Sequence, residues 1–220
     1  FPTRRSSDLS CMLIAFSGFS KKDNLYFRNN TNEQKLIAIR QLMNTAATKN
    51  KAFWKNNSQI DYKLIYCNSK QDIEKYIPGD APAATYTKLG AYVVLQDEGA
   101  DENILAHELC HTILYRNIGW YKKTFQIPAW FDEGLAMQVD DRSYYSIDSL
   151  MMKKKEGLVL PDVTLYKKPN DFFNGNRETI MLRFSVAKYI VYEWLQTHSL
   201  EKFIRAINNG EDFETAYNYR

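Results

Sequence analysis

The stretch Ala106-His107-Glu108-Leu109-Cys110-His111 reads H-E-x-x-H and lies inside a run with helical periodicity. In an α-helix, residues four apart lie on the same face about one turn along, so His107 and His111 direct two imidazoles at one point. Glu108 is turned by about 100° from His107 and flanks that point. Two histidines placed in this way bind Zn²⁺, and the glutamate beside them can take a proton from a metal-activated water. The stretch therefore predicts a metal site on a helix.

The helix that carries these histidines is expected to be buried, because apolar residues nearly surround it. Asp101 provides an N-cap, the periodic run extends from Ile104 to about Arg116, and Gly119 is expected to end the helix. Polar side chains on a buried helix need partners. A metal with its surrounding residues would supply them.

A catalytic zinc site keeps three protein ligands and one open position, so the histidine pair leaves one ligand to find. His198 is the only other histidine; it caps the end of a predicted helix and is interpreted as a surface or packing residue. Glu133 is the best acidic candidate, although acids also favour the first turn of a helix for electrostatic reasons. Asp132 is interpreted either as an acceptor for a ligand imidazole or as a plain first-turn acid.

H-E-x-x-H followed by Trp130-Phe131-Asp132-Glu133-Gly134-Leu135-Ala136 resembles the gluzincin metallopeptidases, the thermolysin-like and aminopeptidase-like group. The closest likeness is to small peptidase-MA-like domains, and the strong match covers about residues 101–140. The resemblance implies that His107, His111 and Glu133 hold one Zn²⁺ and that Glu108 is the general base. It also implies hydrolysis of peptide bonds, with a peptide or protein as substrate.

The sequence departs from the aminopeptidases of this group at 90–94. Gly90-Ala91-Tyr92-Val93-Val94 stands where they carry G-x-M-E-N, which grips the free amine of the substrate. Internal cleavage of a peptide is therefore at least as consistent with the sequence as aminopeptidase action. The strand expected at 91–95 resembles the edge strand of the family, along which an extended substrate pairs. The family also uses a Tyr, His or Arg to stabilise the oxyanion; the candidates here are Tyr144, Tyr145, Tyr166 and Arg183.

Two other classes of function stay open at this point. The domain is alternatively a catalytically inactive zinc-binding module, or a zinc hydrolase that acts on a non-peptide substrate. The second alternative class is an interaction domain that binds no metal. Metal content and the presence of an open coordination position discriminate among these classes.

The pattern of elements predicts an α+β fold: a small mixed or antiparallel sheet with the motif helix, followed by a mostly helical C-terminal half. The resemblance to gluzincins implies that this fold is zincin-like. One catalytic domain is expected, with an N-terminal lobe at 10–118 and a C-terminal lobe at 119–220. Residues 120–127 are expected to connect helices and residues 141–176 to be irregular. The expected strands are 62–66 and 91–95, and the expected helices include 32–48 (capped by Thr31), 129–140, 178–196 and one that follows Ser199.

Two segments near the N-terminus are interpreted separately from the rest of the chain. Phe1–Leu9 resembles the translation of a sequencing-library adapter and is expected to lie outside the fold, the alternative being a basic arm. The apolar segment Cys11–Phe16 is either an ordinary first strand or, with the residues up to 19, the remnant of a signal peptide or anchor. The second interpretation would place the protein outside the cytoplasm or at a membrane; otherwise the location is unknown.

Charge and composition limit the classes of partner that we expect for this protein. Lys and Arg number 29 against 26 Asp and Glu, and they are scattered, so no nucleic-acid partner is expected. No run reaches about 18 apolar residues, so no membrane span is expected. Cys11, Cys67 and Cys110 do not form a disulfide framework, although a Cys67–Cys110 bridge stays open. The oligomeric state is unknown.

Overall fold

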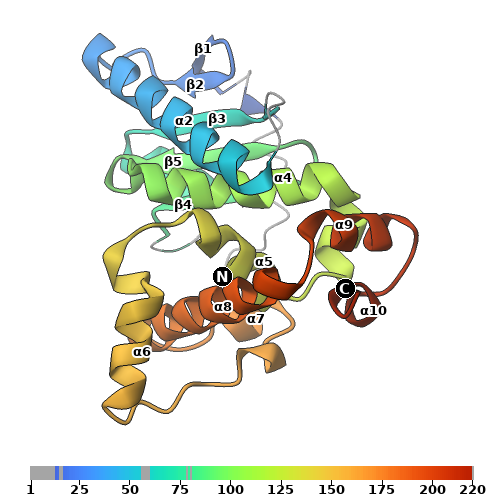
Figure 1. The fold of residues 1–220 in the computed structure, drawn as a ribbon. Helices are drawn as coiled ribbons and strands as arrows, with labels where there is room; N and C mark the ends of the chain where they lie inside the picture. Colours follow the sequence, from blue (N-terminus) through green and yellow to red (C-terminus); the bar gives the residue numbers. More distant parts are fainter. Residues whose placement is uncertain (1–12, 15–16, 56–59, 78, 80, 220) are drawn as a thin grey trace. The chain divides into compact units, whose positions relative to one another are not determined.

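The computed structural model describes residues 13–14, 17–55, 60–77, 79 and 81–219 (Figure 1). The segment Phe1–Leu9, expected to lie outside the fold, is outside the described residues, and so is Cys11–Phe16 apart from Leu13 and Ile14. The chain divides into two compact units, Phe1–Ile113 and Leu114–Arg220. The described residues contain a five-stranded mixed sheet and nine α-helices. The predicted α+β class is confirmed.

The sheet of the N-terminal unit has the order β1-β2-β3-β5-β4. Strand β3 is parallel to both β2 and β5, whereas β1 and β4 are antiparallel edge strands. The strands expected at 62–66 and 91–95 are present one residue later, as β3 and β5. Their bounds, in chain order, are β1 Ser20–Lys22, β2 Leu25–Phe27, β3 Lys63–Cys67, β4 Ala83–Tyr86 and β5 Tyr92–Gln96.

One expectation about this sheet is wrong. The strand at 91–95 does not form an edge, because β5 pairs with β3 on one side and with β4 on the other. The edge position belongs to β4, a four-residue strand that the sequence pattern did not reveal. The short strands β1 and β2 were not predicted either.

Both faces of the central strands are buried. Ile65 and Val94 belong to an apolar cluster with Tyr76 of α3 (Lys70–Tyr76), so α3 covers that face. Tyr66 points to the opposite face, where the ammonium group of Lys35 lies 5.7 Å from the centroid of its ring. Lys35 belongs to α2 (Glu33–Trp54), which therefore covers the second face. Side chains on the two faces of a strand alternate, and this alternation places the two helices on opposite sides.

Helix α2 begins one residue later than predicted. Asn32, and not Thr31, is the N-cap, and its side chain accepts a hydrogen bond from the Lys35 amide. The expected end at 48 is also wrong, since the helix continues to Trp54. Near that end, Nδ2 of the fully buried Asn50 donates to the carbonyl oxygen of Ala106 at 2.9 Å, which joins α2 to α4.

Helix α4 spans Glu102–Phe125 and contains the H-E-x-x-H stretch. Oδ1 of Asp101 accepts hydrogen bonds from the amides of Asn103 and Ile104, at 2.8 and 3.2 Å, which confirms the predicted cap. Gly119 has non-helical backbone angles (φ 82°, ψ 161°), but the helix resumes after it. The connecting segment expected at 120–127 is therefore helical as far as Phe125.

The C-terminal unit is helical around an aromatic core. The ring of Phe131 lies 5.0 Å from that of Phe203, 5.2 Å from that of Phe213 and 5.4 Å from that of Trp194. Short 3-10 helices occur at Met137–Val139, Ser143–Tyr145 and Val163–Leu165, as does one at Asp97–Gly99 in the other unit. The α-helices are α5 Ala129–Ala136, α6 Ile147–Lys155, α7 Pro169–Phe172, α8 Arg177–Thr197, α9 Leu200–Asn208 and α10 Phe213–Tyr217.

The irregular structure expected at 141–176 is wrong for two segments of this unit. Helix α6 begins after Ser146, whose side chain accepts a hydrogen bond from the Ser149 amide, and α7 follows further on. The helices expected at 178–196 and after Ser199 are present as α8 and α9. Helix α5 is shorter than the expected 129–140 and continues only as one 3-10 turn.

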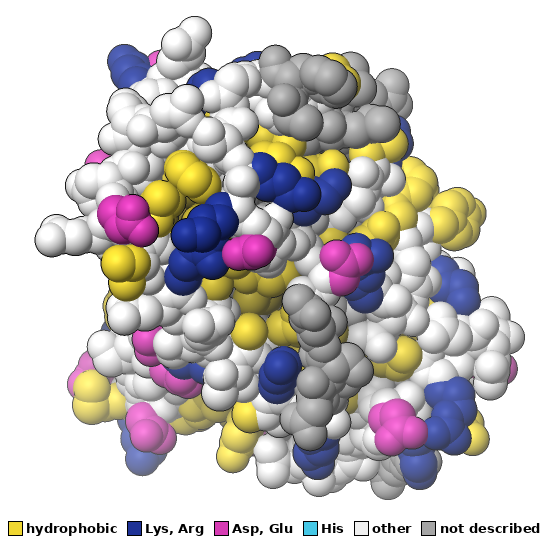
Figure 2. Space-filling view, turned by 90° about the horizontal axis from the view of Figure 1, so that it is seen from above, with side chains coloured by type: hydrophobic (Ala, Val, Ile, Leu, Met, Phe, Trp, Pro, Cys, Tyr) yellow, Lys and Arg dark blue, Asp and Glu magenta, His cyan; other side chains and the backbone are white. Residues whose placement is uncertain are grey.

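Three further properties concern cysteines, membranes and charge. Cys67 and Cys110 are buried thiols and are not joined, so the disulfide bridge left open above is not formed; burial raises the pKa of Cys67 to about 12. Among the described helices, none combines the length and apolar character needed to cross a lipid bilayer. On the face drawn in Figure 2, basic and acidic side chains are interspersed.

Candidate metal centre

His107 and His111 lie one turn apart on α4, as the spacing predicts. Their Nε2 atoms are 3.2 Å apart and their ring centroids 4.9 Å apart. Two nitrogen ligands of a tetrahedral zinc with bonds of about 2.0–2.1 Å would be separated by about 3.3 Å. Both side chains are buried, each 8% exposed. The two nitrogens are thus already spaced as a pair of ligands.

Glu133 lies on α5, within the predicted segment. Pro128 is the N-cap of this helix, so its fixed φ precedes the helix and does not interrupt it. Phe131 and Leu135 on either side are fully buried, and Glu133 itself is only 8% exposed. A carboxylate so removed from water needs a charged or hydrogen-bonding partner.

A buried group made of His107, His111 and Glu133 could hold a metal ion. Each residue offers one ligand atom, and these atoms lie within 4.8 Å of one another. Two imidazole nitrogens and one carboxylate oxygen form a donor set that Zn²⁺ accepts, and it leaves a coordination position open. The chemistry of the donors therefore fits the ion that the sequence pattern predicted.

Glu108 follows His107 on α4 and has a partner of its own. The hydroxyl of Thr85 on β4 lies 2.6 Å from Oε2 of Glu108 and 3.0 Å from its carbonyl oxygen. Both residues belong to the N-terminal unit and are partly buried. The sequence pattern did not reveal this contact, since 23 positions separate the two residues and β4 was not expected.

Asp132 and His198 are placed by packing inside the C-terminal unit. Asp132 forms an ion pair with Lys123, and both side chains are about 15% exposed. The ring of His198 stacks on that of Trp194 at 5.2 Å, and its Nδ1 lies 3.1 Å from the Trp194 carbonyl oxygen. His198 thus has the packing position that the sequence suggested.

Four residues were candidates for stabilising an oxyanion, and two of them have evident roles in the fold. Nη1 of Arg183 donates to the carbonyl oxygens of Phe172 at 2.7 Å and of Asp171 at 3.2 Å. The same guanidinium lies 4.2 Å from the ring centroid of Tyr166. These contacts hold the end of α7 against α8.

The other two candidates, Tyr144 and Tyr145, differ in exposure. Tyr144 is 47% exposed, whereas Tyr145 is buried, and burial raises the pKa of its phenol to about 12. Tyr145 therefore stays protonated at neutral pH and can donate a hydrogen bond.

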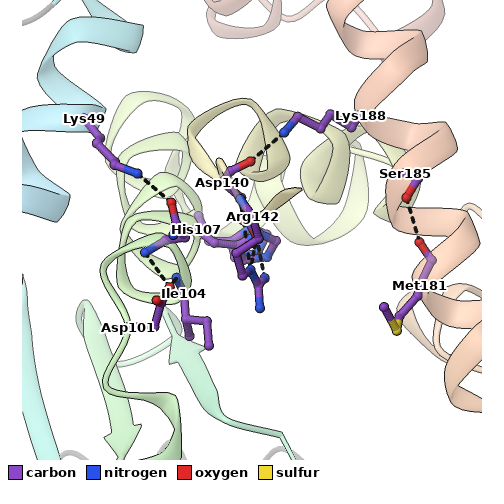
Figure 3. Close-up of polar contacts among 11 residues, drawn as sticks. Lys49, Asp101, Ile104, His107, Asp140, Arg142, Met181, Ser185 and Lys188 are labelled. Carbon is purple, nitrogen blue, oxygen red and sulfur yellow. Dashed lines mark hydrogen bonds and ion pairs between the residues drawn. The ribbon is translucent and has the colours of Figure 1, made fainter. Parts of the chain in front are cut away.

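A polar cluster that the sequence did not single out surrounds Asp140, a fully buried residue after α5 (Figure 3). Nε of Arg142 donates to both carboxylate oxygens, at 2.9 and 3.0 Å. Nζ of Lys188 donates to the backbone carbonyl oxygen of Asp140 at 2.5 Å. The cluster fixes the chain as it leaves α5, so it supports the helix that carries Glu133.

No protein-family model matches the chain, and no curated protein sequence matches it.

Proposed function

We propose that the protein is a zinc-dependent peptidase of the gluzincin kind with a zincin-like fold. One observation carries the proposal: His107, His111 and Glu133 form a buried group able to hold a metal ion, and an H-E-x-x-H glutamate stands beside the two histidines. The 3.2 Å separation of the two Nε2 atoms supports it further. The resemblance of the two sequence segments to gluzincins supplies the reaction class.

In this proposal, His107, His111 and Glu133 hold one Zn²⁺ through two neutral imidazoles and one carboxylate. A bound zinc would supply a Lewis acid that lowers the pKa of water from 15.7 toward about 7 and polarises a carbonyl oxygen. The protein contributes the fixed spacing of the ligands on α4 and the exclusion of bulk water around them. All three ligand residues are 8% exposed.

Glu108 is proposed to move the proton. The Thr85 hydroxyl donates to Oε2 of Glu108, and in this proposal Oε1 would accept the proton of the attacking water. The water oxygen would add to the peptide carbonyl carbon, and the same carboxyl group would deliver that proton to the amide nitrogen as the C–N bond breaks. Glu108 thus serves first as the general base and afterwards as the general acid.

The edge of β4 is proposed to bind the peptide in an extended form. The Gln96 amide donates to the Pro82 carbonyl oxygen, which makes this a hydrogen-bonded pair of the β4–β5 ladder. Hydrogen-bonded and non-hydrogen-bonded pairs alternate along such a ladder. The N–H and C=O groups of Ala83 and Thr85 consequently face away from β5, where a substrate strand can pair with them.

The first test is the metal content of purified protein after dialysis against zinc. About one zinc per chain is expected in the wild type and a much smaller amount in His107→Ala. His198→Ala is the matched control, because it also removes an imidazole but leaves the proposed ligands intact. A wild type that retains no zinc contradicts the proposal.

The second test measures hydrolysis of a mixed peptide library by zinc-loaded protein. Glu108→Gln should keep its zinc and lose hydrolysis, whereas Glu178→Gln, at an exposed position of α8, should retain both. Unchanged turnover in Glu108→Gln contradicts the assigned role. A wild type that binds zinc but cleaves no peptide would instead favour an inactive zinc module or a hydrolase with a non-peptide substrate.

A further inference from the structure

Thr85 and Glu108 form a side-chain contact that links the sheet to the predicted catalytic helix. The Oγ1–Oε2 distance is 2.6 Å, within the 2.5–2.7 Å typical of a hydroxyl that donates to a carboxylate. The hydroxyl also lies 3.0 Å from the Glu108 carbonyl oxygen. Its single proton is therefore shared between two acceptors of the same residue, and the shorter contact is to the carboxylate.

In the part of the chain that the structure describes, this hydroxyl is the hydrogen-bond donor that reaches the Glu108 carboxylate. A glutamate side chain has several rotatable bonds, and holding it in one rotamer costs conformational entropy. Threonine is β-branched and stiff at χ1, so its hydroxyl position follows the strand backbone. The contact thus transfers the rigidity of the sheet to a side chain that would otherwise sample several rotamers.

Thr85 also occupies a special place on β4. Its side chain reaches Glu108 of α4, whereas its backbone N–H and C=O point along the sheet, away from β5. A single residue therefore joins the open backbone edge of the sheet to the Glu108 carboxylate. Any peptide that pairs with this edge would be held at a fixed offset from the base.

We propose that Thr85 is a positioning residue: its hydroxyl holds the Glu108 carboxylate in one rotamer and couples it to the strand on which the substrate pairs. This inference rests on the proposed peptidase function. It assigns Thr85 a role in the rate of the chemical step and none in holding zinc.

The kinetic test compares Thr85→Val, which removes the donor and keeps the shape, with Thr85→Ser, which keeps the donor. Thr85→Val should lower kcat about 10- to 100-fold, since a misplacement of about 1 Å costs up to that factor. KM should change less than about twofold, and zinc content should not change. Thr85→Ser should recover most of kcat. Thr87→Val, two residues along the chain, is the matched control and should behave as the wild type.

A structural readout independent of activity uses crystals of metal-free wild type, Thr85→Val and Thr85→Ser. The Glu108 carboxylate should keep one rotamer in the wild type and in Thr85→Ser, and should leave it in Thr85→Val. If Thr85→Val does not fold, Thr85→Ala replaces it as the donor-free variant in both tests.

The outcomes separate this inference from the proposed function. Wild-type kcat in Thr85→Val, or an unmoved carboxylate in its crystals, overturns the positioning role while the peptidase proposal stands. A zinc-loaded wild type without peptidase activity overturns the proposed function. In that case the crystals alone decide whether Thr85 holds Glu108, and an unmoved carboxylate overturns the inference there too.

Discussion

Gly134 of α5 lies so close to Val191 of α8 that a Cβ atom at position 134 would be 2.6 Å from Val191 Cγ2. The same atom would be 2.7 Å from the backbone carbonyl oxygen of Ala187. Both distances are shorter than ordinary van der Waals contacts. The glycine after Glu133 therefore sets how closely α5 approaches α8, by far the most extensive helix packing of the C-terminal unit.

Gly134→Ala should destabilise the protein by about 1–3 kcal/mol, the usual cost of overpacking a closely packed interior. Urea unfolding monitored by circular dichroism measures the change. Adding Val191→Ala should not restore stability, since the Ala187 carbonyl oxygen would still meet the new methyl group. A Gly134→Ala variant as stable as the wild type would show that α5 can move away from α8 at no cost.

The sequence predicted a helix around Gly134, but it did not predict the role of Gly134 in the packing of α5 against α8. The spacing of His107 and His111 needs only the period of a helix, and α8 and α9 show that period over several turns. The approach of Gly134 to Val191 depends on how two helices pack, which no local pattern reveals. The resemblance to gluzincins pointed to this segment for Glu133 and gave no reason for the glycine.

Three of the strands were likewise not predictable from the sequence. Strands β1, β2 and β4 have three or four residues each, too few for an alternating pattern to stand out from chance. The contact of Thr85 with Glu108 spans 23 positions, and that of Asn50 with Ala106 spans 56. Helix α6 is a different case: its N-cap residue Ser146 is visible in the sequence, yet the whole segment 141–176 was expected to be irregular.

Asn50→Asp should be among the most damaging single substitutions in the N-terminal unit. Nδ2 of Asn50 donates to the carbonyl oxygens of Ala106 at 2.9 Å and Ala46 at 3.1 Å, and the residue is fully buried. An aspartate would place acceptors against acceptors and bury a charge, at a cost of about 3 kcal/mol or more. Asn50→Leu is the control: it removes the same donor without adding a charge and should cost less. Equal losses in the two variants, measured by urea unfolding, would contradict this account.

The pair Asp72–Arg28 should make the N-terminal unit sensitive to acid. Asp72 is buried, and the hydrogen bond from the Arg28 guanidinium, followed by that from Ser69, lowers the pKa of its carboxyl despite burial, which raises it. A depressed folded-state pKa gives stability that is complete above the unfolded-state pKa of about 4 and is lost as the pH falls through the folded value.

Asp72→Asn should therefore cost about 1.5–3 kcal/mol at pH 7, the usual contribution of a hydrogen bond to a charged group. Its unfolding free energy should then fall less than that of the wild type between pH 5 and pH 3. Urea unfolding at several pH values measures both slopes. Parallel slopes in the two proteins would mean that another carboxyl group accounts for the acid sensitivity.

Glu133 decides whether the proposed metal centre has three protein ligands or two. Glu133→Ala should weaken zinc binding at least about 100-fold, because even partners that only orient a ligand contribute about 10- to 100-fold. Glu133→His should recover part of the affinity, since three histidines also form a recognised zinc site. Competition with a chromophoric chelator measures the affinity of each variant, and circular dichroism checks that each is folded. If Glu133→Ala binds zinc as tightly as the wild type, α4 alone provides the site, and the gluzincin proposal fails at its third ligand.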